Sequence, residues 1–95
     1  MRLKYSEEAL NDLDEILAFI AKESPARAVS FIEEIKEKIE LLLDFPALGV
    51  SCQSKGIPAN CRVMIFGAYL IFYSVVEEDI LILSIINAAK DYATQ

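Results

Sequence analysis

The chain has 95 residues, a formal charge of −6 and a hydrophobic fraction of 55%. We therefore expect one acidic globular domain over residues 1–95. The high hydrophobic fraction excludes intrinsic disorder, and the negative net charge argues against a protein that binds nucleic acid through its overall charge. Because the chain contains no His, it lacks the commonest general base and metal ligand, and we expect neither a metal nor a cofactor.

A short strand and two amphipathic helices are predicted in the N-terminal half. The strand is expected at Arg2–Tyr5. Ser6 can cap a helix, because acidic residues and then apolar residues at spacings of three and four follow it, as far as about Glu23. Ser24 and the proline after it start a second helix, which we expect to end at residues 43–44. The short break between the helices predicts an antiparallel hairpin.

The C-terminal half is predicted to be a loop followed by strands. Residues 45–60 hold most of the Gly and Pro residues and read as the loop. Three segments beyond it are dense in Val, Ile, Phe and Tyr: Arg62–Phe66, Tyr69–Val76 and residues 80–86. Gly67 begins a two-residue turn between the first two. The predicted fold is therefore α+β: an N-terminal strand, a helical hairpin and a three-stranded antiparallel meander.

Both faces of this sheet are predicted to be apolar. In the middle strand, Tyr69, Ile71, Tyr73 and Val75 alternate with Leu70, Phe72, Ser74 and Val76. In the last strand, Ile80, Ile82, Ser84 and Ile86 alternate with Leu81, Leu83 and Ile85. The helical hairpin can cover one face. The other is covered either by residues 45–60 and the tail or by a partner chain, and we favour the partner.

No membrane segment or export signal is predicted. The longest uncharged run, residues 63–76, is shorter than the roughly 20 residues of a spanning helix, and the N-terminus has no apolar signal segment. We therefore expect a cytoplasmic protein that does not associate with membranes. Cys52 and Cys61 fit no zinc spacing, so we expect reduced thiols without a role, with a disulfide between them as the less favoured alternative.

Several sequence pieces in this order resemble a known family. They are Ala9, Asp12, Leu13 and Ile16; Ser24-Pro25 with Ala28 and Phe31; the run LLLDFPALG; Arg62, the run Tyr69-Leu-Ile-Phe-Tyr73 and Val75; and the ending Lys90-Asp91-Tyr92. Taken together they resemble the RelE/ParE superfamily of bacterial type II toxins. The similarity is greatest to the ParE branch, whose members are often labelled plasmid stabilisation proteins.

The resemblance implies a toxin that a cognate antitoxin holds inactive by wrapping an extended or helical segment around it. Such a partner fits the two-sided apolar sheet. Members of the superfamily act in two ways. RelE-like toxins enter the ribosome and cut mRNA, whereas ParE-like toxins bind and poison DNA gyrase without nuclease chemistry.

The residues available for RNA cleavage are few. Cleavage through the 2′-hydroxyl needs groups that activate the hydroxyl, stabilise the charged intermediate and protonate the leaving oxygen. The candidates are Lys55, Arg62, Lys90 and Tyr92. The His that usually follows the last strand is absent, and Lys90 stands where the family usually has Arg, which alone makes a planar two-point phosphate contact.

We therefore predict a ParE-like toxin that binds DNA gyrase and is neutralised by an antitoxin. Two alternatives remain: a RelE-like ribosome-dependent mRNA endoribonuclease, and a decayed or repurposed non-toxic member, which the acidity of the chain motivates. The chain is not expected to bind nucleic acid strongly by itself, and it allows a homodimer. The residues proposed for partner binding are Arg62, Tyr69, Ile71, Tyr73, Lys90 and Tyr92, although Tyr69 and Tyr73 also read as core or interface aromatics.

Overall fold

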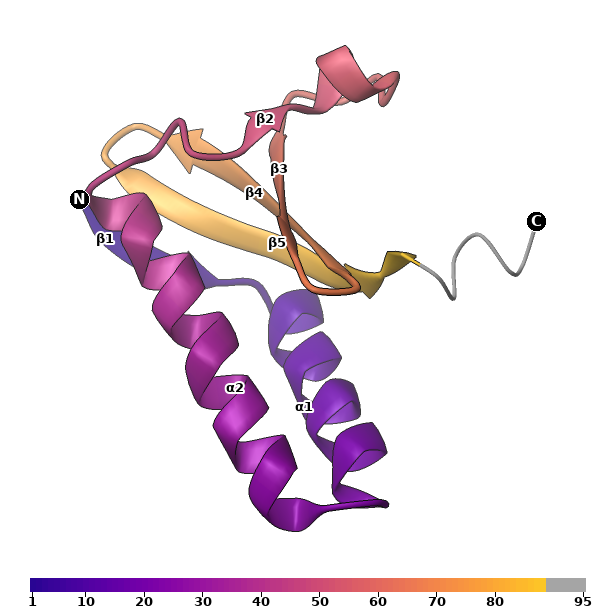
Figure 1. The fold of residues 1–95 in the computed structure, drawn as a ribbon. Helices are drawn as coiled ribbons and strands as arrows, with labels where there is room; N and C mark the ends of the chain where they lie inside the picture. The colour runs from indigo at the N-terminus through magenta and orange to yellow at the C-terminus, as the bar shows by residue number, and fades with distance from the viewer. Residues whose placement is uncertain (89–95) are drawn as a thin grey trace.

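The computed structural model describes residues 1–88, which form two helices packed on one face of a five-stranded sheet (Figure 1). The elements in chain order are β1 (Arg2–Tyr5), α1 (Glu7–Ala21), α2 (Pro25–Glu40), the 3-10 helix η1 (Leu41–Leu43), β2 (Val50–Ser51), the 3-10 helix η2 (Cys52–Lys55), β3 (Arg62–Phe66), β4 (Tyr69–Val76) and β5 (Asp79–Asn87). None of the helices in this part of the chain is both long and apolar enough to span a membrane.

Both predicted helix starts are confirmed, because each serine caps its helix. The Ser6 hydroxyl accepts a hydrogen bond from the Ala9 amide, and the Ser24 hydroxyl accepts one from the Arg27 amide. Such caps satisfy amides that have no partner within the first helical turn. The helix ends differ slightly from the prediction. Helix α1 ends two residues before Glu23, and α2 passes into η1 before the predicted end.

The predicted meander is the centre of a larger, mixed sheet, which corrects the expected architecture. Strands β3, β4 and β5 pair antiparallel as predicted. The sheet order is β1-β5-β4-β3-β2, with β1 parallel to β5 at one edge and β2 antiparallel to β3 at the other. Strand β2 lies within the predicted loop. It has only two residues, too few for an alternating pattern to indicate a strand.

A β-bulge in β5 corrects the predicted alternation of that strand. Phe72 pairs with Ser84, but the next residue, Tyr73, pairs with Ile82, so that Leu83 is an extra residue in the ladder. The extra residue reverses the alternation beyond it. Ile85 therefore joins the buried side, whereas Ser84 moves to the opposite side. Ser6 fixes the bulge, because its hydroxyl donates a hydrogen bond to the Leu83 carbonyl oxygen at 2.8 Å.

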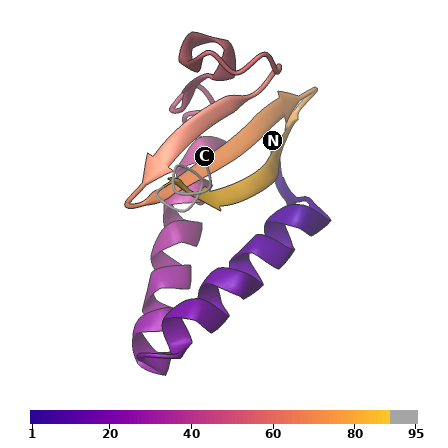
Figure 2. The same ribbon diagram turned by 90° about the vertical axis from the view of Figure 1, so that its right-hand side faces the viewer.

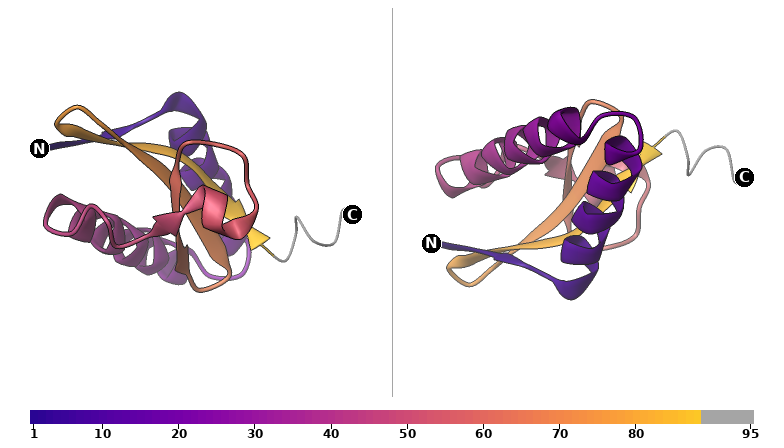
Figure 3. Two further views of the ribbon diagram at one scale, coloured as in Figure 1. Left: turned by 90° about the horizontal axis from the view of Figure 1, so that it is seen from above. Right: turned by 90° about the horizontal axis from the view of Figure 1, so that it is seen from below.

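The core lies between the helical hairpin and one face of the sheet, which we call the inner face (Figures 2 and 3). The inner face contributes Met64, Tyr69, Ile71, Tyr73, Ile80, Ile82 and Ile85, and the helices contribute Ala9, Leu13, Ile16, Ile35, Ile39 and, from η1, Leu42. Neither α1 nor α2 lies on the opposite face of the sheet (Figure 3). One helical layer thus covers one side only.

Tyr73 attaches the segment after η1 to the core. Its hydroxyl donates a hydrogen bond to the Pro46 carbonyl oxygen at 2.7 Å and accepts one from the Gly49 amide at 2.8 Å. Gly49 must be glycine for this contact, because a Cβ atom there would lie 2.8 Å from the Tyr73 ring and 2.8 Å from the Val63 carbonyl oxygen. One buried hydroxyl therefore positions the chain that leads into β2.

A disulfide joins Cys52 to Cys61, which contradicts the expectation of two reduced thiols. The prediction was wrong because it weighed only the cellular redox environment and the spacing of the two residues. Folding places the two cysteines directly after β2 and directly before β3, with Cα atoms 5.3 Å apart. Paired strand ends bring side chains to this separation. The pairing that creates the disulfide thus depends on β2, which the sequence pattern did not indicate.

The role of the Tyr73 hydroxyl can be tested by Tyr73→Phe. The variant removes both hydrogen bonds and leaves a buried amide and a carbonyl oxygen without a partner, so we expect the free energy of unfolding to fall by about 2–3 kcal/mol. Chemical denaturation measures the change. Tyr69→Phe is the matched control, since no hydrogen bond involves the Tyr69 hydroxyl in the described structure, and it should cost under about 1 kcal/mol. Equal losses in both variants would contradict this role.

Candidate partner-binding surfaces

The face of the sheet opposite the helices, which we call the outer face, is largely apolar. The strand register places side chains of neighbouring strands side by side on this face: Ile65 pairs with Leu70, and Leu70 pairs with Ile86. Ile65 is 63% exposed, and Leu70, Phe72 and Ile86 are partly exposed. Apart from Asp79, the outer-face side chains of β3 to β5 are Val63, Ile65, Leu70, Phe72, Ser74, Val76, Leu81, Ser84 and Ile86. Exposed apolar surface of this extent is typical of interaction sites.

Charged residues stand only at the end of the outer face. Asp79, which begins β5, forms ion pairs with Lys4 at 3.0 Å and with Arg2 at 3.5 Å, both on the neighbouring β1. An apolar centre with a polar rim is the usual composition of a protein–protein interface. The distribution of charge therefore favours a protein partner for this face.

A groove of about 710 Å³ runs between α1 and the end of β5. Its apolar walls include Phe19, which is 65% exposed, and Ile85. Asp12 links the two sides of the groove, because its carboxylate accepts a hydrogen bond from the Ile85 amide at 2.8 Å. The full lining is Asp12, Glu15, Ile16, Ala18, Phe19, Lys22, Tyr69, Ile85, Ile86 and Asn87. Since Ile86 also belongs to the outer face, the groove and the outer face form one continuous surface.

Three residues proposed for partner binding lie under the helices. Ile71 and Tyr73 are completely buried, and Tyr69 is 9% exposed. They are core residues of the inner face, with Tyr69 also packing against the Phe31 ring at 5.4 Å. A partner that docks on the folded chain therefore meets the side chains between them in sequence, Leu70 and Phe72.

The sequence pattern did not indicate which apolar face stays open, and it did not indicate the groove. The alternation in β4 separates the two faces but does not say which one the helices cover. The two serines in the predicted strands could have indicated which face stays open. Once the bulge is included, Ser74 and Ser84 stand on the same, outer face. The groove residues on α1 gave no such signal, because they belong to the ordinary helical pattern.

The candidate catalytic residues do not form a recognisable acid–base cluster in the described part of the chain. Lys55 is exposed at the end of η2 and takes part in no ion pair there. Arg62 begins β3 on the same side of the sheet as Tyr73. The Arg62 Nε atom is buried and has no hydrogen-bond partner within residues 1–88. Lys90 and Tyr92 lie outside the described residues.

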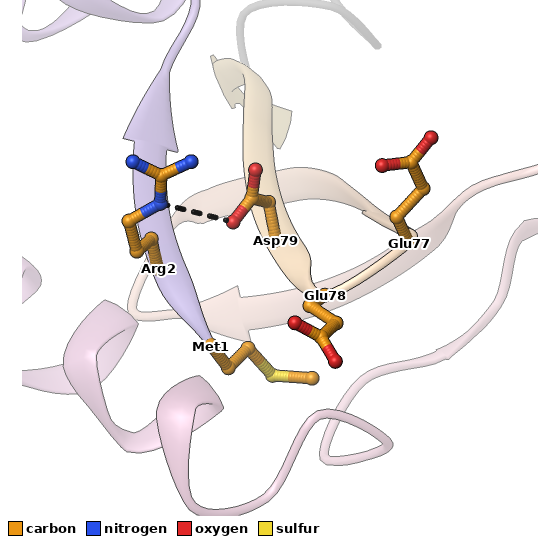
Figure 4. A pocket seen from close by; sticks show the side chains of 5 residues that line it. All are labelled: Met1, Arg2, Glu77, Glu78 and Asp79. Carbon is orange, nitrogen blue, oxygen red and sulfur yellow. Dashed lines mark ion pairs between the residues drawn. The ribbon is translucent and has the colours of Figure 1, made fainter.

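A second depression, of about 260 Å³, is lined by acidic side chains (Figure 4). Glu77 points away from Asp79, and Asp79 is turned toward Arg2 (Figure 4). Within residues 1–88, no group of three acidic or cysteine side chains is arranged to hold a metal ion. The Lys4 hydrogen bond and the nearby charges of Lys4 and Arg2 hold the pKa of the Asp79 carboxyl below its usual value. This depression is therefore an ion-paired sheet end without the geometry of a metal site.

Comparison with known proteins places the chain in a toxin family. A family model described as the ParE toxin of type II toxin-antitoxin systems matches residues 3–92. A chain from the chromosomal ParDE system of P. aeruginosa has the same fold, with a TM-score of 0.76 and 24% identity over 92% of this chain and 95% of that one. A chain from the intact E. coli RelBE toxin-antitoxin complex is more distant, with a TM-score of 0.57 and 18% identity over 87% and 90%. No curated protein matches.

The ion pairs at Asp79 make a testable contribution to the pH dependence of stability. Because the pKa of Asp79 is lowered by folding, its interactions stabilise the fold above the ordinary Asp pKa of about 3.9, and this stability is lost as the pH falls through the lowered pKa. We expect Lys4→Gln to raise the Asp79 pKa in a carboxyl NMR titration, and Lys55→Gln to leave it unchanged. An unaltered Asp79 pKa in Lys4→Gln would show that Lys4 is not the cause.

Proposed function

Because the chain belongs to the ParE toxin family of type II toxin–antitoxin systems, we propose that it acts by binding and inhibiting DNA gyrase, and that a cognate antitoxin prevents this. The proposed target places its action in the cytoplasm. The observation that carries the proposal is the pairing of the family match with an open sheet face whose centre is apolar and whose charges lie at one end. Such a face is suited to protein binding, and its centre supplies no group for acid–base catalysis.

The side chains described here favour binding over RNA cleavage. General acid–base catalysis needs a group that can gain or lose a proton near neutral pH. The described candidates, Arg62 and Lys55, are both cations, and no ion pair or hydrogen bond joins them to a carboxylate within the described residues. The chain contains no His to take this role. A cation without a base can hold a target but cannot by itself activate a 2′-hydroxyl.

Arg62 is the residue we propose to contact the target. Buried polar groups are nearly always hydrogen-bonded, and an exception is often explained by function. The unpartnered Nε of Arg62 belongs to a guanidinium that can donate two parallel hydrogen bonds to a carboxylate. A carboxylate of the target protein would satisfy this donor. The sequence motif and the unsatisfied atom thus favour the same residue.

We propose that the antitoxin covers the outer face and continues into the groove between α1 and β5. Ile86 belongs to both surfaces, so a single extended or helical segment can cross from one to the other. The centre of the outer face offers apolar contacts, whereas the groove adds the carboxylates of Asp12 and Glu15. Burying this surface would remove the largest exposed apolar area of the sheet from water.

The gyrase proposal predicts that the purified chain inhibits DNA supercoiling by purified gyrase and leaves mRNA intact in a translating extract. Arg62→Ala should raise the concentration needed for half-inhibition at least about tenfold, since it removes a charged hydrogen-bond donor. Lys55→Ala, which removes an exposed cation from η2, should have little effect. Normal supercoiling together with cleaved mRNA would favour the ribonuclease alternative. Normal supercoiling with intact mRNA would favour a non-toxic member.

The antitoxin surface predicts a specific loss of affinity in Ile65→Lys. A lysine in the apolar centre of the outer face must be desolvated when the partner binds, so we expect the Kd for the antitoxin encoded beside this chain to rise at least about tenfold. Isothermal titration calorimetry measures the Kd. Val29→Lys is the matched control, because Val29 is 55% exposed, close to the 63% of Ile65, but lies on α2. Equal effects of the two variants would contradict this surface.

A further inference from the structure

The cysteine pair has a chemical role that toxin activity does not require. We propose that Cys52 and Cys61 form a reversible thiol–disulfide site, at which small thiols such as glutathione react through the sulfur of Cys61. The two residues are the only cysteines of the chain and are joined in the structure. The proposal concerns the isolated chain, so it stands or falls independently of the gyrase target.

The backbone holds the two cysteines together without help from the sulfur–sulfur bond. The Cys52 amide donates a hydrogen bond to the Cys61 carbonyl oxygen at 2.9 Å, and the Cys52 carbonyl oxygen accepts one from the Ile57 amide at 3.0 Å. Within the loop, the Cys61 amide also bonds to the Ala59 carbonyl oxygen at 3.0 Å. Reduction leaves these bonds available. The two thiols therefore stay close enough to re-form the disulfide when an oxidant is present.

The two cysteine residues differ in exposure. Cys52 is completely buried, whereas Cys61 is partly exposed. Thiol–disulfide exchange requires direct attack of a thiolate on one sulfur, and access decides which sulfur is attacked. An external thiolate can reach the disulfide only from the side of Cys61. The structure thus assigns Cys61 as the attacked residue and Cys52 as the leaving group.

The exchange conserves atoms and electrons in two steps. A glutathione thiolate attacks Cys61 Sγ, forms a mixed disulfide there and expels Cys52 as a thiolate, which takes a proton from water. A second glutathione thiolate attacks the glutathione sulfur of the mixed disulfide and releases the Cys61 thiolate with oxidised glutathione. Two electrons pass from two glutathione molecules to the protein disulfide. Oxidised glutathione drives the same steps in reverse.

The disulfide adds a covalent link to the weakest edge of the sheet. Strand β2 pairs with β3 through only two residues, Val50 and Ser51. Cys52 follows this pairing directly, and Cys61 precedes Arg62, so the disulfide extends the ladder at its end. Its loss leaves residues 52–61 held by their backbone hydrogen bonds and by the one that the Ser74 hydroxyl donates to the Asn60 carbonyl oxygen at 3.3 Å. Reduction should therefore loosen the loop that carries Lys55 and the start of β3 that carries Arg62.

The assignment of the reacting sulfur is tested with two single variants and oxidised glutathione. In Cys52→Ser the free thiol is the partly exposed Cys61, and in Cys61→Ser it is the buried Cys52. We expect the mixed disulfide to form at least about tenfold faster in Cys52→Ser, measured by intact-protein mass. Thermal melting first establishes that both variants are folded. Equal rates, or faster reaction of Cys61→Ser, would overturn the assignment.

The wild-type chain tests whether the disulfide is reversible and controls the loop. The chain is equilibrated with mixtures of reduced and oxidised glutathione, its thiols are alkylated, and the oxidised and reduced forms are compared in trypsin digestion. We expect two thiols to appear together, cleavage after Lys55 to become at least several-fold faster, and the Tm to fall by at least about 5 °C on reduction. Two alkylated thiols at every glutathione ratio, or identical cleavage and Tm in both forms, would refute the proposal.

Discussion

The sheet has two apolar faces and only one helical layer, so α1 and α2 leave the outer face uncovered, and the proposed function depends on this imbalance. The hairpin of α1 and α2 encloses the inner face completely at its centre, where Ile71 and Tyr73 have no exposed surface. On the outer face, by contrast, Ile65 is 63% exposed, and Leu70 and Phe72 are partly exposed. A chain with this asymmetry gains stability from a partner that supplies the missing layer. The open outer face therefore supports the proposal that an antitoxin binds this chain.

The helices and the long strands could be predicted because local signals and burial agree. Ser6 and Ser24 cap the helices that the apolar periodicity indicates. Strands β3 to β5 are rich in β-branched and aromatic residues and are joined by short turns, so their antiparallel order follows from chain connectivity. The separation of Tyr69, Ile71 and Tyr73 from Leu70 and Phe72 was likewise predictable, because it depends only on the alternation of a strand.

The features that the sequence did not indicate depend on contacts between distant segments. The helices could cover either apolar face, and the chosen face is fixed by contacts such as those of the Tyr73 hydroxyl with Pro46 and Gly49. The bulge at Leu83 depends on its fit to Ser6. The disulfide depends on β2, whose two residues carry no periodic signal. Sequence patterns reflect local preferences and do not indicate these pairings.

Binding of the antitoxin to the outer face can be tested through intermolecular contacts to isoleucine methyl groups. Isoleucines occur on both sides of the sheet, with Ile65 and Ile86 on the outer face and Ile71 and Ile82 in the core. In a complex of the methyl-labelled chain with unlabelled antitoxin, we expect intermolecular nuclear Overhauser effects to Ile65 and Ile86 and none to Ile71 or Ile82. Such effects confined to the solvent side of α2, with none at Ile65 and Ile86, would contradict it.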